Sequence, residues 1–226
     1  MRMIAVFEKG ERVRHIGHLD IQRAVQRGLR RSGLPVAYSN GFSPHILVSF
    51  ASALSTGAWG RREIMDVTMA GETTPEEFLS RMNAAMPPEM QLSSARRVED
   101  RYPSPMARLR AAEYTIYIDG HDAAEKMTCA LDGFLKQEEI KAERKTKTGV
   151  KPCDIRPLIY ELSKAPERDA LRCLLALTES EACKPGMLVS ALSGFAGLDA
   201  APRVLVERTG LYGRAEDGRF MPLETL

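Results

Sequence analysis

Apolar residues recur along the chain at two spacings, and segments with these spacings follow one another in a regular order. Alternation of apolar and polar residues predicts a strand, whereas apolar residues three or four positions apart predict a helix. The first half gives strand, helix, strand, strand, helix and strand, over residues 3–7, 18–32, 46–51, 63–69, 74–86 and 91–98. Because this βαββαβ order is typical of the ferredoxin-like fold, we expect one such domain over residues 1–100.

The second half of the chain repeats this order with one addition. Strands are expected over 113–119, 140–146, 157–162, 170–178 and 204–209, and helices over 121–136 and 185–195. The addition is an extra strand or long hairpin after the first of these helices. Prolines at 103 and 105 mark residues 100–110 as a linker. We therefore predict an α+β protein with two tandem ferredoxin-like domains, 1–100 and 111–226, a cleft between them, and an inserted hairpin in the second.

The helix expected over residues 18–32 is basic on one side. Gly17 precedes it, and Gly33 followed by Pro35 is a typical helix end. At roughly 100° per residue, one side is apolar, and four arginines gather on the other: Arg23, Arg27, Arg30 and Arg31. Asp20 is the one carboxylate near them in sequence. This pattern has two interpretations. The basic face is either simply solvated, or it binds an anionic partner, because the arginines lack acidic neighbours.

The segment after this helix combines a predicted turn with aromatic and polar residues. Asn40 and Gly41 tolerate positive φ and favour a turn. The side chains that would surround it suit nucleobases and phosphates together. They are Tyr38, Asn40, Phe42, Ser43 and His45. The alternative is an ordinary structural turn with Phe42 packed in the core.

A second basic cluster lies in the expected hairpin of the second domain. Its residues are Arg144, Lys145, Lys147, Lys151 and, after Asp154, Arg156. Opposite the arginine helix and Arg14, this cluster would complete a groove for RNA, because neutralised phosphates release counterions and drive binding. Two alternatives remain: a mobile hairpin that keeps the protein soluble, and an ion pair between Asp154 and Arg156.

Three of the four histidines lie in or beside the same N-terminal stretch. His15, His18 and His45 could act as acid and base in RNA cleavage without a metal. His18, however, falls on the apolar side of the helix, where a capping or core role is the alternative. With Asp20 the histidines do not match a usual zinc spacing, so no metal site is expected.

Composition limits these interpretations. The chain has 226 residues and a formal net charge of +2, so any nucleic-acid site must be a local cluster. The four cysteines include no Cys-x-x-Cys pair, which fits reduced thiols and a cytoplasmic protein. No stretch approaches the roughly 18 apolar residues of a membrane span. Neither a P-loop nor a Rossmann fingerprint is present, and no cofactor is expected.

Two long segments resemble a known family. The sequences HIGHLDIQRAVQRGLRRSGLPVAYSNGFSPHILVSFASAL and KTKTGVKPCDIRPLI are similar to the two motifs of the radical-SAM-linked protein family. Ser43 stands where that family usually has Asn, and Ile46-Leu47 replaces the usual Pro-Lys. The resemblance implies a B12-binding radical SAM protein as neighbour or fusion partner. This chain lacks the three-cysteine cluster of a radical SAM iron-sulfur centre and is not itself that enzyme.

Together these features predict an RNA-binding accessory module that is not itself catalytic. It would bind tRNA or rRNA and work with the radical SAM enzyme. One alternative is a metal-independent endoribonuclease that uses the three histidines. The other is a protein-interaction adaptor that binds the radical SAM partner without touching RNA.

Overall fold

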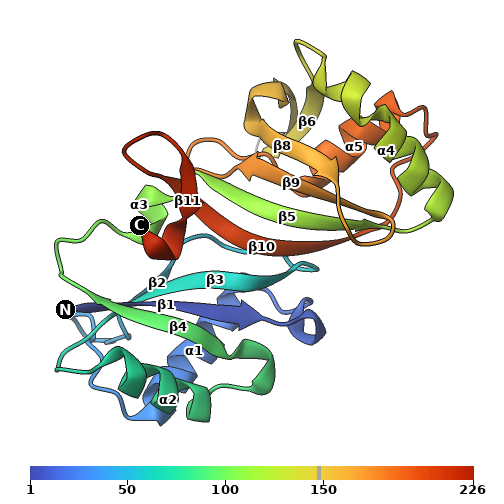
Figure 1. Cartoon of the computed structure of the whole chain (residues 1–226). Helices are drawn as coiled ribbons and strands as arrows, with labels where there is room; N and C mark the ends of the chain where they lie inside the picture. The colour runs from blue at the N-terminus through green and yellow to red at the C-terminus, as the bar shows by residue number, and fades with distance from the viewer. Residues whose placement is uncertain (147–148) are drawn as a thin grey trace. The chain divides into compact units, whose positions relative to one another are not determined.

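The computed structural model describes residues 1–146 and 149–226, and the chain divides into two compact units (Figure 1). Unit 1 comprises residues 1–109 and 210–226, and unit 2 comprises residues 110–209. The predicted ranges were 1–100 and 111–226, so the C-terminal segment groups with the first unit instead of the second. The described residues form a mixed α and β structure with five α-helices. Among them, no helix is both long and apolar enough to cross a membrane.

Unit 1 contains strands and helices in the predicted order. They are β1 (Arg2–Lys9), α1 (His18–Ser32), β2 (Val48–Phe50), β3 (Trp59–Thr68), α2 (Pro75–Ala85) and β4 (Leu92–Val98). β1 pairs antiparallel with both β3 and β4, and β2 pairs antiparallel with β3. The strand order in this unit is therefore β4-β1-β3-β2. The short helix α3 (Pro105–Arg108), capped by Ser104, lies in the segment that the prolines marked as a linker.

The core of unit 1 lies between this sheet and its two helices, which cover one face (Figure 1). α1 contributes Ile21, Val25 and Leu29, each 4% exposed or less. α2 adds Phe78 and Met82, which are fully buried. Burial of such a side chain stabilises the fold by about 1.5–3 kcal/mol. This apolar contact fixes which face of α1 is turned outward, and that face carries the arginines.

Unit 2 has the predicted hairpin between its first helix and its later strands. Its elements are β5 (Ala111–Ile118), α4 (His121–Leu135), β6 (Lys141–Thr146), β7 (Gly149–Asp154), β8 (Ile159–Lys164), β9 (Ala170–Ala176), α5 (Pro185–Phe195) and the first part of β10 (Val204–Arg214). β9 pairs antiparallel with β5 and β8, whereas β6 and β7 form a separate two-stranded sheet. The strand expected at residue 157 begins at Ile159, after a short 3₁₀ turn.

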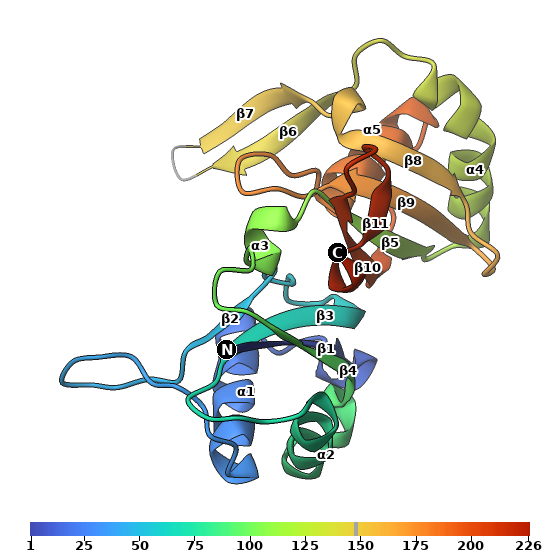
Figure 2. The same ribbon diagram turned by 60° about the vertical axis from the view of Figure 1, so that its left-hand side comes forward.

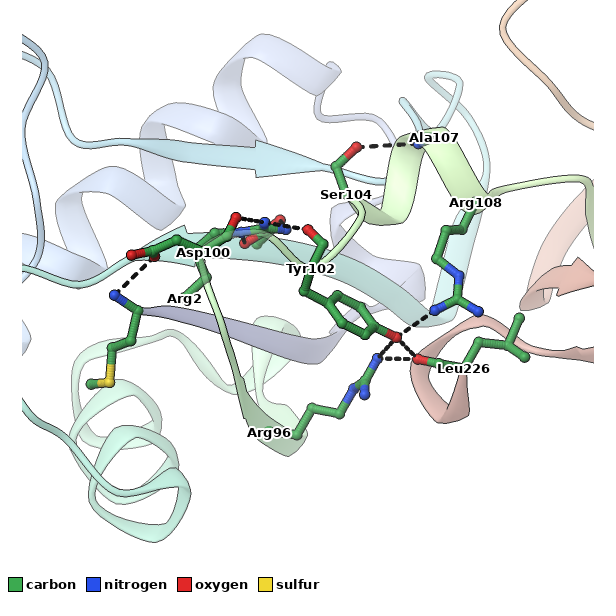
Figure 3. A network of polar contacts seen from close by, with 10 residues as sticks. Arg2, Arg96, Asp100, Tyr102, Ser104, Ala107, Arg108 and Leu226 are labelled. Atoms are coloured by element: carbon green, nitrogen blue, oxygen red, sulfur yellow. Dashed lines mark hydrogen bonds and ion pairs between the residues drawn. The ribbon is translucent and has the colours of Figure 1, made fainter. Parts of the chain in front are cut away.

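The C-terminal segment of unit 1 is held by a network of polar contacts (Figure 3). The Tyr102 hydroxyl accepts hydrogen bonds from Arg96 Nη2 at 2.8 Å and Arg108 Nη1 at 2.6 Å. It donates to the carbonyl oxygen of Leu226, which Arg96 also contacts. The last part of β10 also pairs with β11 (Phe220–Pro222). These contacts explain why residues 210–226 belong to unit 1.

Candidate nucleic-acid interface

The exposed face of α1 carries the four predicted arginines, and they are engaged to different degrees. Arg23 Nη1 forms an ion pair with Asp20 Oδ1 at 3.0 Å. Arg31 Nη2 donates a hydrogen bond to the carbonyl oxygen of Ala85 at 2.5 Å. Arg27 and Arg30 are exposed, and within residues 1–146 and 149–226 no hydrogen bond or ion pair engages either guanidinium group. These two guanidinium groups are therefore available to an anionic ligand.

Arg14 is engaged within the loop before α1. Its Nη1 contacts Glu11 Oε1 at 3.1 Å, and its carbonyl oxygen accepts hydrogen bonds from Lys9 Nζ and the Gly57 amide. The Arg14 side chain is 28% exposed, and its buried Nε has no hydrogen-bond partner among the described residues. The contacts of Arg14 therefore hold the loop that precedes α1, and its guanidinium group is already paired with Glu11.

Residues 36–47, which we call the arm, form an irregular hairpin that projects from unit 1 (Figure 2). Val36 bridges to Met69 at the base, and Tyr38 bridges to Ile46 further out. The amide of Leu47 donates to the carbonyl of Ala37 at 2.9 Å, so the two sides are hydrogen-bonded. Val36 and Ile46 are 7% and 1% exposed. The arm is therefore anchored in the core at its base.

The tip of the arm presents an aromatic ring to solvent. Phe42 is fully exposed, and Tyr38 is 48% exposed. Asn40 and Ser43, on either side of Phe42, are exposed as well. Gly41 has a φ of +116°, which glycine tolerates, whereas Asp169 is the one non-glycine residue with a positive φ in the part of the chain that the structure describes, so Asn40 does not share this conformation. The alternative in which Phe42 packs in the core is wrong, because the turn lies beyond the last buried residues of the arm.

The three histidines of the N-terminal stretch have different environments. His45 shares a hydrogen bond of 2.8 Å between its Nδ1 and Ser39 Oγ, and its amide donates to the same oxygen at 3.1 Å. His18 begins α1 and lies edge-on to the Phe50 ring, with ring centroids 5.3 Å apart. His15 is exposed in the loop before α1. His45 therefore ties the two sides of the arm together, and His18 packs against the core.

A small cavity lies beside His18. Its lining includes Lys9 and Glu63, which are 2% and 4% exposed, together with Phe50 and Ser52. The space is about 10 Å³, room for about one water molecule. It is far too small for a nucleotide, so this cavity is not a substrate pocket.

The second basic cluster is partly used for folding. Arg144 Nη2 donates to the carbonyl of Ala182 at 3.1 Å, and Arg156 Nε donates to the carbonyl of Leu135 at 3.0 Å. Asp154 Oδ1 accepts hydrogen bonds from the amides of Ile140 and Arg156. Asp154 thus binds the Arg156 backbone, whereas the Arg156 guanidinium caps the end of α4.

The remaining members of this cluster are lysines. Lys151 is exposed on β7, opposite Arg144 in the β6–β7 register. Lys147 and the side chain of Lys145 lie outside the described residues. Among the described side chains of the two basic clusters, the arginines without an intramolecular contact, Arg27 and Arg30, lie in unit 1.

One family model matches residues 2–185 of the chain, more than three quarters of its length. The chain belongs to this family. It is described as "Uncharacterized protein conserved in bacteria (DUF2344)". The match includes α1, the arm and the β6–β7 hairpin. No curated protein matches the sequence.

Two further features of this DUF2344 chain bear on its chemistry. In the part of the chain that the structure describes, no group of three or more His, Cys, Asp or Glu residues is arranged to hold a metal ion. Two apolar side chains near the start of α1 are exposed, Ile16 at 38% and Leu19 at 66%. No motif in the sequence marks these two residues, although Leu19 falls outside the apolar side of the predicted helix.

Proposed function

We propose that the chain is an RNA-binding accessory module, not itself catalytic, whose interface is formed by α1 and the arm. The observation that carries this proposal is the pair Arg27 and Arg30, two exposed arginines that form no ion pair with any carboxylate among residues 1–146 and 149–226. Exposed, unneutralised guanidinium groups favour phosphate, which they bind in a bidentate manner. The arm follows the same helix and adds aromatic and polar groups that suit bases. The RNA would be a tRNA or an rRNA.

The proposed partner is a B12-binding radical SAM enzyme. This part of the proposal comes from the two sequence motifs that resemble the radical-SAM-linked protein family, one in α1 and the arm and the other in the β6–β7 hairpin. The partner would carry out the chemistry, and this chain would present the RNA to it.

The fold that we propose for this role is a tandem of ferredoxin-like domains. Support comes from the antiparallel order β4-β1-β3-β2 of unit 1, with α1 and α2 in the connections. In unit 2, β5, β9 and β8 pair in the corresponding order, and α4 and α5 take the places of the helices. The β6–β7 hairpin is then the insertion.

The test is binding of the purified chain to small cellular RNA at about 50 and 200 mM salt, concentrations between which phosphate contacts lose much of their affinity. Replacing both Arg27 and Arg30 with Ala should weaken binding and lower the slope of log K against log salt by about two. The matched control is Arg97→Ala with Arg219→Ala, two exposed arginines that already have acidic partners. Equal losses in the two double variants would contradict the proposed interface.

A protein-interaction adaptor is the second candidate, favoured by the exposed side chains of Ile16 and Leu19. In that case nuclease-treated protein would retain its radical SAM partner, and the Leu19→Ser variant would release it. The endoribonuclease alternative predicts RNA cleavage in EDTA that is lost when His15 or His45 is replaced with Ala.

A further inference from the structure

The ring of Phe42 is the most exposed large apolar side chain among the described residues. It lies at the end of the arm, between the exposed residues Asn40 and Ser43. The arm contains no acidic residue, so nothing in residues 36–47 repels a phosphate backbone. An aromatic face with polar neighbours and no negative charge matches the chemistry of a nucleobase in an RNA chain.

The arm is built to hold this ring away from the core. Its base is buried at Val36 and Ile46, and its middle is tied by the Ser39 amide to the His45 carbonyl at 2.8 Å. The side chain of Ser39 adds two contacts with His45. The five residue steps from Val36 to Gly41 span at most about 17 Å of chain. The ring is therefore presented on a hydrogen-bonded support.

Paired and unpaired RNA differ in what they offer to an exposed aromatic ring. In a continuous duplex the bases are paired and stacked, and the deep major groove does not admit side chains. In a loop or a single strand the bases are unstacked and offer a free face to an aromatic ring. The Arg27 and Arg30 side chains meet phosphates in either form.

Resting on the proposed function, we propose that Phe42 stacks on an unpaired base and directs the chain to loops or single-stranded segments of RNA. The Asn40 amide and the Ser43 hydroxyl are then placed beside the edges of that base. Two contributions to affinity follow. The arginines of α1 contribute affinity that depends on salt and is the same for paired and unpaired RNA. The arm contributes affinity that requires an unpaired nucleotide.

The experiment measures binding of the full chain to a single strand of about 12 nucleotides, a length within the usual site sizes, and to the duplex of the same sequence. Phe42→Ala should weaken binding to the single strand by roughly 5- to 100-fold, as expected for loss of one base–aromatic stack. Its affinity for the duplex should stay within about twofold of the original, and its salt slope for either RNA should not change. Arg27→Ala with Arg30→Ala should weaken binding to both RNAs.

Two conservative variants separate stacking from apolar contact. Phe42→Trp should restore single-strand affinity, and its fluorescence should be quenched by the single strand but not by the duplex. The fluorescence background in this variant comes from one other tryptophan, the buried Trp59. Phe42→Leu keeps an apolar side chain without a π face, and it should behave like Phe42→Ala.

The outcomes distinguish this inference from the proposed function. If the unaltered protein binds neither RNA at low salt, the proposed function fails and the inference fails with it. If the protein binds RNA but Phe42→Ala weakens both forms equally or neither form, the stacking role is overturned and the RNA-binding function stands. Full single-strand affinity in Phe42→Leu would also overturn it.

Discussion

Asp169 has a positive φ of 54°, which residues with a side chain rarely adopt. Its carboxylate contacts His121 Nδ1 at 2.6 Å and Arg168 Nε at 3.3 Å. The hydrogen bond from His121, and then the charges of His121 and Arg168, lower the pKa of Asp169 from its usual 3.8. Two properties suit Asp to this position: it tolerates this backbone conformation, and its carboxylate contacts His121.

We expect the Asp169 carboxyl to titrate below 3.8 in the folded protein and to return toward that value in the His121→Ala variant. Because the folded-state pKa is depressed, the stability it contributes is present above the unfolded-state pKa. That stability is lost as the pH falls through the folded-state pKa. Carbon NMR of the Asp169 carboxyl measures the midpoint directly. His15→Ala, at an exposed histidine of unit 1, is the control, and an unchanged midpoint in His121→Ala would contradict the assignment.

At the scale of elements, the ends of α1 could be predicted because their causes are local. Gly17 precedes the helix, and Gly33, with a φ of 65°, follows it. The arm could not be predicted in the same way. Its base depends on the pairing of Val36 with Met69, which lies more than 30 positions further along the chain. The exposure of Phe42 follows from that pairing, so the sequence left both of its alternatives open.

Gly33→Ala should destabilise unit 1 by about 1–2 kcal/mol, because an L-residue with a Cβ is strained in the left-handed conformation. The new Cβ would also lie 2.8 Å from Arg81 Nη2. Arg81 itself holds the end of α1 through a hydrogen bond from its Nε to the Ser32 carbonyl at 2.9 Å. Thermal unfolding followed by circular dichroism would show a midpoint several degrees lower.

The control for this substitution is Gly194→Ala in α5, where, apart from its chain neighbours and the helix backbone, no atom of the described residues lies within 4 Å of the added Cβ. There the greater helix propensity of Ala should raise stability by up to about 1 kcal/mol. A loss of the same size in both variants would argue against a special conformational requirement at Gly33.

At the scale of the molecule, the division of the chain depends on contacts that sequence periodicity does not report. β10 is one continuous strand over Val204–Arg214, yet the boundary between the two units falls inside it. Periodicity assigned everything after residue 111 to one domain, because no local signal marks that boundary. In unit 2, likewise, the clustering of basic residues in the sequence does not show which of them are engaged within the fold. The clustered Arg144 and Arg156 bind the carbonyls of Ala182 and Leu135, which their positions in the sequence could not reveal.

The contacts of Tyr102 with Arg96, Arg108 and Leu226 predict how the C-terminal segment is coupled to unit 1. Tyr102→Phe removes the hydroxyl that joins these groups, so the part-buried guanidinium groups of Arg96 and Arg108 lose a hydrogen-bond acceptor. The free energy of unfolding should fall by about 1–3 kcal/mol. Hydrogen exchange should rise in residues 220–226, whereas unit 2 should keep its protection. Tyr38→Phe, at an exposed position on the arm, should leave both regions unchanged. If exchange rose equally in both units after Tyr102→Phe, the segment would be a global stabiliser of the fold. If it rose only near the C-terminus, the segment would be a part of unit 1 that opens locally.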